Sequence, residues 1–242
     1  MKHRPLRTGL AALALALSVG PVVSGCGILD DGKGDPTPAA SSTPSAAAAA
    51  FDSQFTRDGT FQSHIELPGA PGVDFVYTLY PTKSTPRTNE WYPAGSKYFS
   101  FTFQAYDLSR DLRDPFKSKR KVYLSNIAVT SATTTSNGGA TQSPYALDSA
   151  APKITFDPQP LRTKYGMLIT SPKGAFELRN QEIGEVSADT IGITLSFNAT
   201  VSIETAAGSG QFTEANVTQD VPIAIFASDT PTEAQSIPVN AN

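Results

Sequence analysis

Few side chains in this chain of 242 residues are suited to catalysis, and only two of them are histidines. A Ser-His-Asp hydrolase needs a general base, and the sequence offers His3 and His64. His64 lies between Gln62 and Glu66 in an alternating segment, which places it on the polar face of a predicted strand. The G-x-S-x-G nucleophile elbow does not occur in the chain. The pattern therefore predicts a surface histidine.

Other chemical motifs match only in part. Ser118-Lys119-Arg120-Lys121 has the S-x-x-K spacing of a nucleophilic serine, but the companion K-T-G and S-D-N sequences are missing. A zinc site draws mainly on histidine and cysteine, and the chain has two histidines and one cysteine. Gly208-Ser209-Gly210 lacks the lysine of a phosphate-binding loop. We expect no catalytic residue, metal or cofactor, and an enzyme, in the form of a hydrolase, is the least favoured class.

The single cysteine, Cys26, ends a segment with a basic start and an apolar run of about 14 residues. This is the layout of a secretory signal peptide, and the run is shorter than the roughly 20 residues of a membrane-spanning helix. Val23-Ser24-Gly25-Cys26 resembles the lipobox of bacterial lipoproteins. The resemblance implies removal of residues 1–25, diacylglycerol on Cys26, and anchoring to the extracytoplasmic face of the cell membrane. The Ala-rich, Lys-poor composition also resembles that of high-GC bacteria such as actinobacteria.

Charge is distributed unevenly along the chain. The predicted signal holds three of the 19 Lys and Arg and none of the 22 Asp and Glu, so the mature chain has a balance of −6. Nucleic acid is therefore not an expected partner. Residues 83–121 carry nine basic and four acidic side chains, whereas residues 181–242 carry eight acidic and no basic ones. Either the two segments face each other in the fold, or a basic surface meets an anionic lipid or polymer.

Composition also predicts the domain boundaries. Residues 26–50 are rich in Pro, Ser, Ala and Gly without aromatics, which predicts a disordered tether with a reach of roughly 25–30 Å. Residues 51–227 form the expected folded domain, and residues 228–242 a flexible tail. The polar stretch 133–152 interrupts the domain, either as a mobile loop or as a linker that divides it.

Alternation of apolar and polar residues dominates the domain. We expect strands over residues 60–67, 73–80, 97–106, 121–130, 153–156, 166–170, 175–179, 190–206 and 212–227. Charge spacing predicts one or two helical turns over 106–115. The pattern indicates an all-β fold, an antiparallel β-sandwich of immunoglobulin-like or related type. The alternative is an open or flattened β-barrel with an apolar groove.

The longest alternating segment has seven apolar residues at every second position from Ile191 to Ile203. These residues would span roughly 40 Å, at about 3.3 Å per residue. We expect so long a strand to bend, to be broken at Gly192 or Asn198, or to follow an elongated groove. Pro222 in the returning strand predicts an edge or bulge position, because proline cannot donate to a ladder.

Six aromatic residues are candidate contacts for a ligand or lipid. Trp91 and Tyr92 lie in an expected loop, where they stack on sugars, dip into lipid or pack against the end of the domain. Phe99, Phe101 and Phe103 share one strand face, and with Phe197 they form either a dry core or the wall of an apolar cavity.

These two alternatives correspond to two functions. A closed core favours a non-catalytic binding or scaffold module of the cell envelope. Its partner would be an envelope protein, a glycolipid or a cell-wall polymer. An open cleft favours a lipid or glycolipid carrier.

Overall fold

The computed structural model describes residues 51–83 and 89–227, all within one compact unit. The signal peptide, Cys26, the tether and the tail predicted from the sequence lie outside the described residues. The strands are β1 (Phe61–Glu66), β2 (Val73–Pro81), β3 (Lys97–Asp107), β4 (Val122–Thr135), β5 (Ala146–Ala150), β6 (Arg162–Thr163), β7 (Gly166–Leu168), β8 (Phe176–Ile183), β9 (Thr190–Glu204) and β10 (Phe212–Ala224). The helices are α1 (Gln54–Asp58), the 3-10 helix η1 (Phe116–Ser118) and α2 (Ala151–Ile154).

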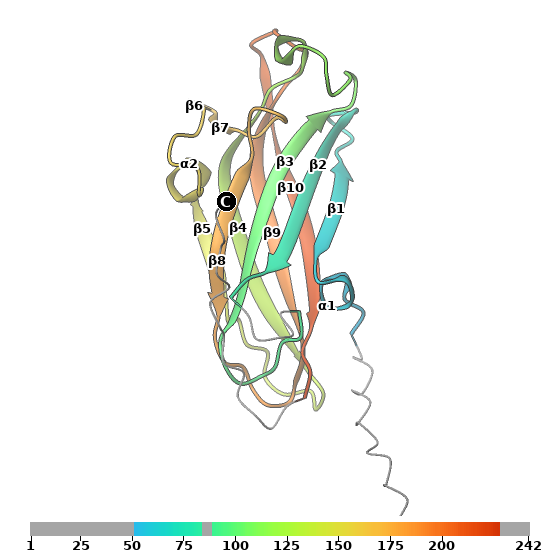
Figure 1. Cartoon of the computed structure of the whole chain (residues 1–242), viewed down its shortest axis with the longest axis vertical. Helices are drawn as coiled ribbons and strands as arrows, with labels where there is room; N and C mark the ends of the chain where they lie inside the picture. Colours follow the sequence, from blue (N-terminus) through green and yellow to red (C-terminus); the bar gives the residue numbers. More distant parts are fainter. Residues whose placement is uncertain (1–50, 84–88, 228–242) are drawn as a thin grey trace, which may run out of the picture. The chain divides into compact units, whose positions relative to one another are not determined.

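Two antiparallel sheets pack face to face (Figure 1). One sheet has the strand order β1-β2-β3-β8. The other has the order β10-β9-β4-β7-β6, and β5 pairs with β4 beside β7. The predicted antiparallel β-sandwich is therefore confirmed, and the sheets do not close into a barrel.

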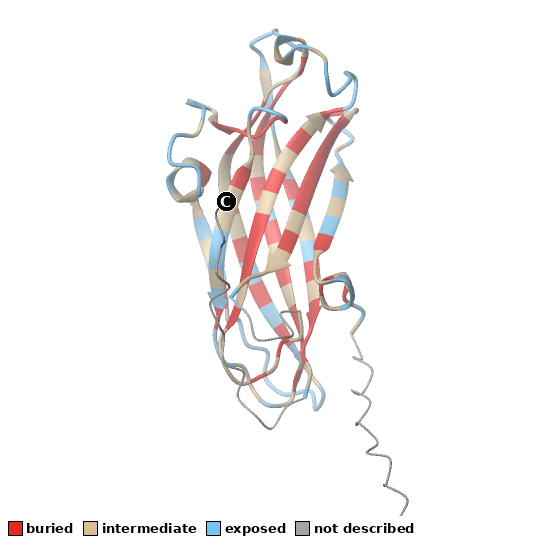
Figure 2. Ribbon diagram, in the orientation of Figure 1, coloured by how far each residue is buried: buried red, intermediate tan, exposed pale blue. Residues whose placement is uncertain are grey.

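The inward residues of both sheets form one core. Phe99, Phe101 and Phe103 of β3 are 0% exposed, and Figure 2 shows buried and intermediate residues alternating along much of this strand. The Phe101 ring meets the Phe197 ring of the opposite sheet edge-on at 4.9 Å, and the Phe103 ring stacks on Tyr77 at 4.2 Å. Such ring pairs add about 0.5–1.5 kcal/mol each to the stabilisation from apolar burial.

The long strand β9 runs unbroken over 15 residues. Its pairing with β10 has no register shift, and Asn198 lies in a regular part of both its ladders. A register shift against β4 adjoins Gly192, where an added Cβ would lie 2.9 Å from the ring of Phe51. The irregularity predicted at Gly192 is therefore present beside it, whereas none occurs at Asn198, and β9 pairs along its length because the flanking strands β4 and β10 are nearly as long, at 14 and 13 residues.

The β9–β10 hairpin and the edge position of Pro222 are both confirmed. Pro222 lies in β10, the last strand of its sheet, opposite Thr194. Its missing N–H therefore removes no bond from a central ladder.

The stretch 133–152 is not a structureless interruption. It contains the end of β4, all of β5 and the start of α2. β5 pairs with residues Asn126–Thr130 of β4. Strands from both sides of the stretch pair with each other, β3 with β8 and β4 with β9, so the stretch does not separate two sub-domains.

Two short segments differ from their predicted structure. Helical turns were predicted over 106–115, but β3 continues to Asp107, whose carboxylate accepts hydrogen bonds from the backbone N–H and hydroxyl of Ser109 and starts a turn. The strand predicted over 153–156 overlaps α2 instead. Pro152 lies in the first turn of α2, where its missing N–H breaks no helical hydrogen bond.

The segment 169–171 connects the two sheets at one side of the sandwich. The N–H of Ile169 donates to Val122 of β4, and its carbonyl accepts from the N–H of Ala105 of β3, both at 2.9 Å. The N–H of Ser171 donates to the Ala105 carbonyl at 2.9 Å. These bonds place the following turn, residues 172–175, beside the outward face of β3.

Candidate functional site

The four phenylalanines predicted to line a core or a cavity lie in the core. Phe99, Phe101 and Phe103 are fully buried, and Phe197 is 2% exposed. The Phe99 ring also meets Tyr145 edge-on at 5.2 Å, and the Phe101 ring meets Phe176 at 5.6 Å. Their faces are therefore covered by other side chains of the sandwich.

Trp91 packs against the end of the domain. Its ring meets that of Phe55 of α1 edge-on at 5.0 Å, and its carbonyl accepts a hydrogen bond from the Phe226 N–H at 2.8 Å. Tyr92 is partly exposed, and its hydroxyl donates to Glu90 at 3.1 Å. The structure thus brings Trp91 and Tyr92 to this end of the sandwich, apart from the phenylalanine stripe.

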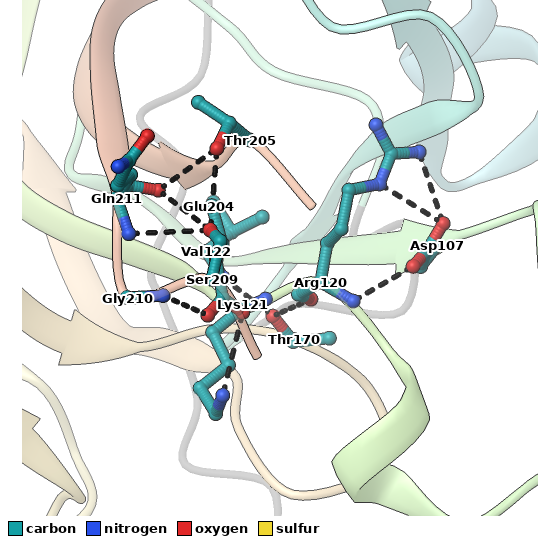
Figure 3. A network of polar contacts seen from close by, with 10 residues as sticks. All are labelled: Asp107, Arg120, Lys121, Val122, Thr170, Glu204, Thr205, Ser209, Gly210 and Gln211. Carbon is teal, nitrogen blue, oxygen red and sulfur yellow. Dashed lines mark hydrogen bonds and ion pairs between the residues drawn. The ribbon is translucent and has the colours of Figure 1, made fainter. Parts of the chain in front are cut away.

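Asp107 and Arg120 form the first half of a buried polar network (Figure 3). The Asp107 carboxylate accepts from the Arg120 backbone N–H at 2.7 Å and from its Nη2 at 3.0 Å. Arg120 Nη2 also donates to the Pro71 carbonyl at 3.0 Å. Burial raises the pKa of Asp107, but the hydrogen bonds from Arg120 and Ser109 outweigh it and hold this pKa below its usual value.

Glu204 and Lys121 form the second half of the network. Glu204 is almost fully buried, and its carboxylate accepts from the backbone N–H of Lys121 at 3.1 Å, from Lys121 Nζ at 3.3 Å and from the Gly210 N–H at 3.1 Å. Burial raises the pKa of Glu204, but these hydrogen bonds lower it below the ordinary value. Thr170 links the halves, because its hydroxyl accepts from Val122 and donates to the Arg120 carbonyl.

The network has a structural role, because hydrogen bonds around Asp107 and Glu204 join β3 and β9 to the residues that lead into β4. Each carboxylate oxygen in it accepts at least one hydrogen bond, so none is left as a free base. Lys121 comes from the basic segment and Glu204 from the acidic segment of the chain, so the two segments do meet in the fold. Lys121 is also the lysine of the S-x-x-K match that starts at Ser118. The hydroxyl of Ser118 donates to the Pro115 carbonyl, whereas the lysine donates to Glu204.

His64 lies on the surface, as predicted, with its side chain 59% exposed. Its Nδ1 lies 2.6 Å from the carboxylate of the buried Asp74, an arrangement that orients an imidazole in many active sites. The other ring nitrogen contacts the amide of Gln62 at 3.0 Å. Among the described residues no serine, threonine or cysteine hydrogen-bonds this ring, so the pair lacks a nucleophile.

A pocket of about 260 Å³ opens between the edge of β8 and the turn 172–175. We call it the Phe156 pocket. Its apolar side includes Phe156, Leu161 and Pro172, and its polar side includes Gln104, Asp157 and Lys173. The pocket therefore combines an apolar wall with several hydrogen-bonding groups.

Phe156 is 55% exposed, but two contacts hold its ring in place. The backbone N–H of Phe156 donates to the Glu177 carbonyl at 2.7 Å. The guanidinium of Arg179 lies 3.4 Å from the ring centroid and is held there by an ion pair with Glu177. The guanidinium covers one face of the ring, and Arg179 is not among the residues that line the pocket.

No sequence motif identified this pocket, because Phe156 was assigned to a predicted strand. The signal that argues against a strand is local: Phe156 is followed by Asp157-Pro158-Gln159-Pro160. Two prolines so close together remove ladder donors and favour an exposed turn.

In the parts of the chain that the structure describes, no group of three His, Cys, Asp or Glu side chains is placed to hold a metal ion. Within the same residues, no helix has the length and apolar character needed to cross a bilayer.

Comparison with known proteins finds no relative: no family model, no curated protein and no solved structure matches the chain.

Proposed function

We propose that the mature protein is a lipoprotein of the bacterial cell envelope, anchored to the extracytoplasmic face of the membrane through diacylglycerol on Cys26. Its folded domain acts there as a non-catalytic binding module. Support comes from the lipobox resemblance of residues 23–26 and from the tether composition of residues 26–50. Two or more acyl chains anchor a protein durably, whereas a single chain binds reversibly.

One observation favours surface recognition over lipid carriage. From Ile193 to Ile203, the inward residues of β9 are at most 5% exposed. A carrier needs an apolar cavity for an acyl chain, and here the apolar faces of the two sheets are occupied by contacts with each other. The partner is therefore recognised on the outside of the sandwich, and it is an envelope protein, a glycolipid headgroup or a cell-wall polymer.

The anchor is tested by membrane fractionation of the producing bacterium. The wild-type protein is expected in the membrane fraction, and the Cys26→Ala variant in the soluble extracytoplasmic fraction or as unprocessed precursor. A processed Cys26→Ala protein that remains with the membrane would contradict the lipid anchor.

The binding function is tested with the full mature chain carrying Cys26→Ser, so that no acyl chain is present. We expect saturable co-sedimentation with envelope fragments of the producing bacterium, and an apo mass in native mass spectrometry. Linear, non-saturating sedimentation would reject the binding module. A co-purified lipid would instead favour the carrier.

A further inference from the structure

We propose that the Phe156 pocket binds one neutral sugar ring of a glycan chain. The inference rests on the proposed function as an envelope binding module, and it assigns the chemical class of that module's ligand.

The size of the pocket favours a single ring. Pockets for drug-sized ligands have volumes of roughly 300–1,000 Å³. The Phe156 pocket, at about 260 Å³, lies just below that range. It therefore has room for one sugar ring, while the rest of a longer ligand must lie outside it.

The apolar side of the pocket suits the C–H face of a sugar. An exposed aromatic ring offers a flat apolar surface, and the ring of Phe156 is already held by the Arg179 guanidinium and by its backbone bond to Glu177. Little rotational freedom remains to be lost when a ligand stacks on it. Leu161, which is also exposed, extends the same apolar wall.

The polar side of the pocket suits hydroxyl groups. Asp157 accepts one hydrogen bond through Oδ1, from Gln159, and its Oδ2 accepts none from a described residue. Lys173 forms no ion pair with a described residue, and its Nζ lies 5.1 Å from the Phe116 ring centroid. The residues that line the pocket thus include an acceptor in Asp157 and a donor in Lys173, and hydroxyl groups of a ligand can bond to either kind of group.

The charge around the pocket favours a neutral ligand. The pocket lining includes the carboxylates of Asp157 and Glu177 and the cation of Lys173, and Arg179, beside the pocket, pairs with Glu177, so the charges of these four groups sum to zero. Because these charges cancel, the pocket has no net attraction for an anionic or a cationic ligand, and a neutral ligand fits it best.

The surroundings of the pocket favour a chain over a free monosaccharide. Gln104 lies on the outward face of β3, and its Oε1 accepts from the hydroxyl of Tyr106 at 3.0 Å. Glu177 accepts from the hydroxyl of Tyr80 at 3.3 Å. Both tyrosines are partly exposed, so the next sugar rings of a chain would lie over aromatic side chains that already contact the pocket lining.

The test is a ¹⁵N NMR titration of the full mature chain carrying Cys26→Ser. The probes are two neutral tetrasaccharides, chitotetraose and maltotetraose, the anionic tetragalacturonate, and a tetra-alanine peptide. We expect saturable shifts of the Phe156, Leu161 and Gly174 amides with at least one neutral tetrasaccharide. We expect Phe156→Ser and Asp157→Asn each to weaken this binding at least tenfold.

Leu112→Ser is the matched control, because Leu112 is 67% exposed in a different loop and its replacement should leave binding unchanged. The proposal is overturned if neither neutral tetrasaccharide shifts these amides at about 10 mM, or if Phe156→Ser binds as the wild type does. Shifts with tetra-alanine alone would assign the pocket to a peptide, and shifts with tetragalacturonate alone to an acidic polymer. If envelope co-sedimentation persists while the sugar titration fails, the binding module stands and only its ligand class is wrong.

Discussion

Replacing Asp107 by asparagine should unfold the sandwich at a markedly lower temperature. The buried carboxylate accepts three hydrogen bonds from Arg120 and two from Ser109. The amide of Asp107→Asn would leave the charge of Arg120, whose side chain is largely buried, without its counter-ion. Removing one partner of a buried ion pair costs about 3–5 kcal/mol.

This loss is measurable by urea and thermal denaturation. In a domain of this size each kcal/mol lowers Tm by about 2–4 °C, so a decrease of roughly 10 °C is expected. The double variant Asp107→Asn/Arg120→Met should recover part of the loss, with a coupling energy of about 1–3 kcal/mol. Asp58→Asn is the control, because Asp58 pairs with Arg57 on the surface, where such pairs contribute at most about 1 kcal/mol.

The pH dependence provides a second readout of the same pair. The pKa of Asp107 is lower in the folded protein than its usual value, so its stabilisation is complete above the pKa of the unfolded chain, near 4. It is lost as the pH falls through the folded pKa. The stability difference between wild type and Asp107→Asn should therefore be largest near pH 7 and shrink below about pH 4. A cost below about 1 kcal/mol, or a coupling energy near zero, would refute the assignment of this pair as a buried tie.

Three further predictions concern the core, one turn and one lysine. Phe101→Ala should lower the free energy of unfolding by about 3–5 kcal/mol, whereas Phe156→Ala should change it by less than about 1 kcal/mol, because only Phe101 is buried; similar losses in urea titrations would contradict this difference. Gly166→Ala should lower the free energy of unfolding by more than about 2 kcal/mol, because φ of Gly166 is 118° and an added Cβ would lie 2.2 Å from the Leu124 carbonyl oxygen. Gly184→Ala is the control, because an added Cβ there has no neighbour within 4 Å. Burial lowers the pKa of Lys97 to about 8 from 10.5, so between pH 8 and 10 the unfolded chain binds more protons than the folded one. The free energy of unfolding of the wild type should therefore rise relative to that of Lys97→Met over this range. A difference between the two proteins that stays constant with pH would show that the lysine titrates normally.

The strands were predictable because alternation reports directly on which side chains share a face. Phe99, Phe101 and Phe103 had to lie together whatever their surroundings, because the side-chain period of a strand is two. The same pattern located β9, β10 and their hairpin. The short elements α1, α2 and β5 carry no comparable period, and contacts made elsewhere in the fold determine their structure. β5, for example, depends on the free side of β4.

The polar network and the Phe156 pocket could not be read from the sequence, because their members are far apart in it. Glu204 is 83 residues from Lys121, and Arg179, whose guanidinium lies against the Phe156 ring, comes from β8. Neither pair has a spacing that a motif would record. Charge bias offered contact between the two segments as one of two alternatives, and it did not identify which residues pair.

The sequence by itself determined the strand pattern and indicated the antiparallel sandwich, since both depend on the local order of residue types, and lipid attachment at Cys26 stays a prediction from the sequence. Only the tertiary structure decided between a cavity and a core. The sequence of an apolar strand face is the same whether it lines a cavity or a packed core. Which of the two forms depends on whether the side chains of the opposite sheet fill the space between the sheets. Here Phe197 and its neighbours on β9 fill it, and the exposed ring at Phe156 becomes the candidate contact instead.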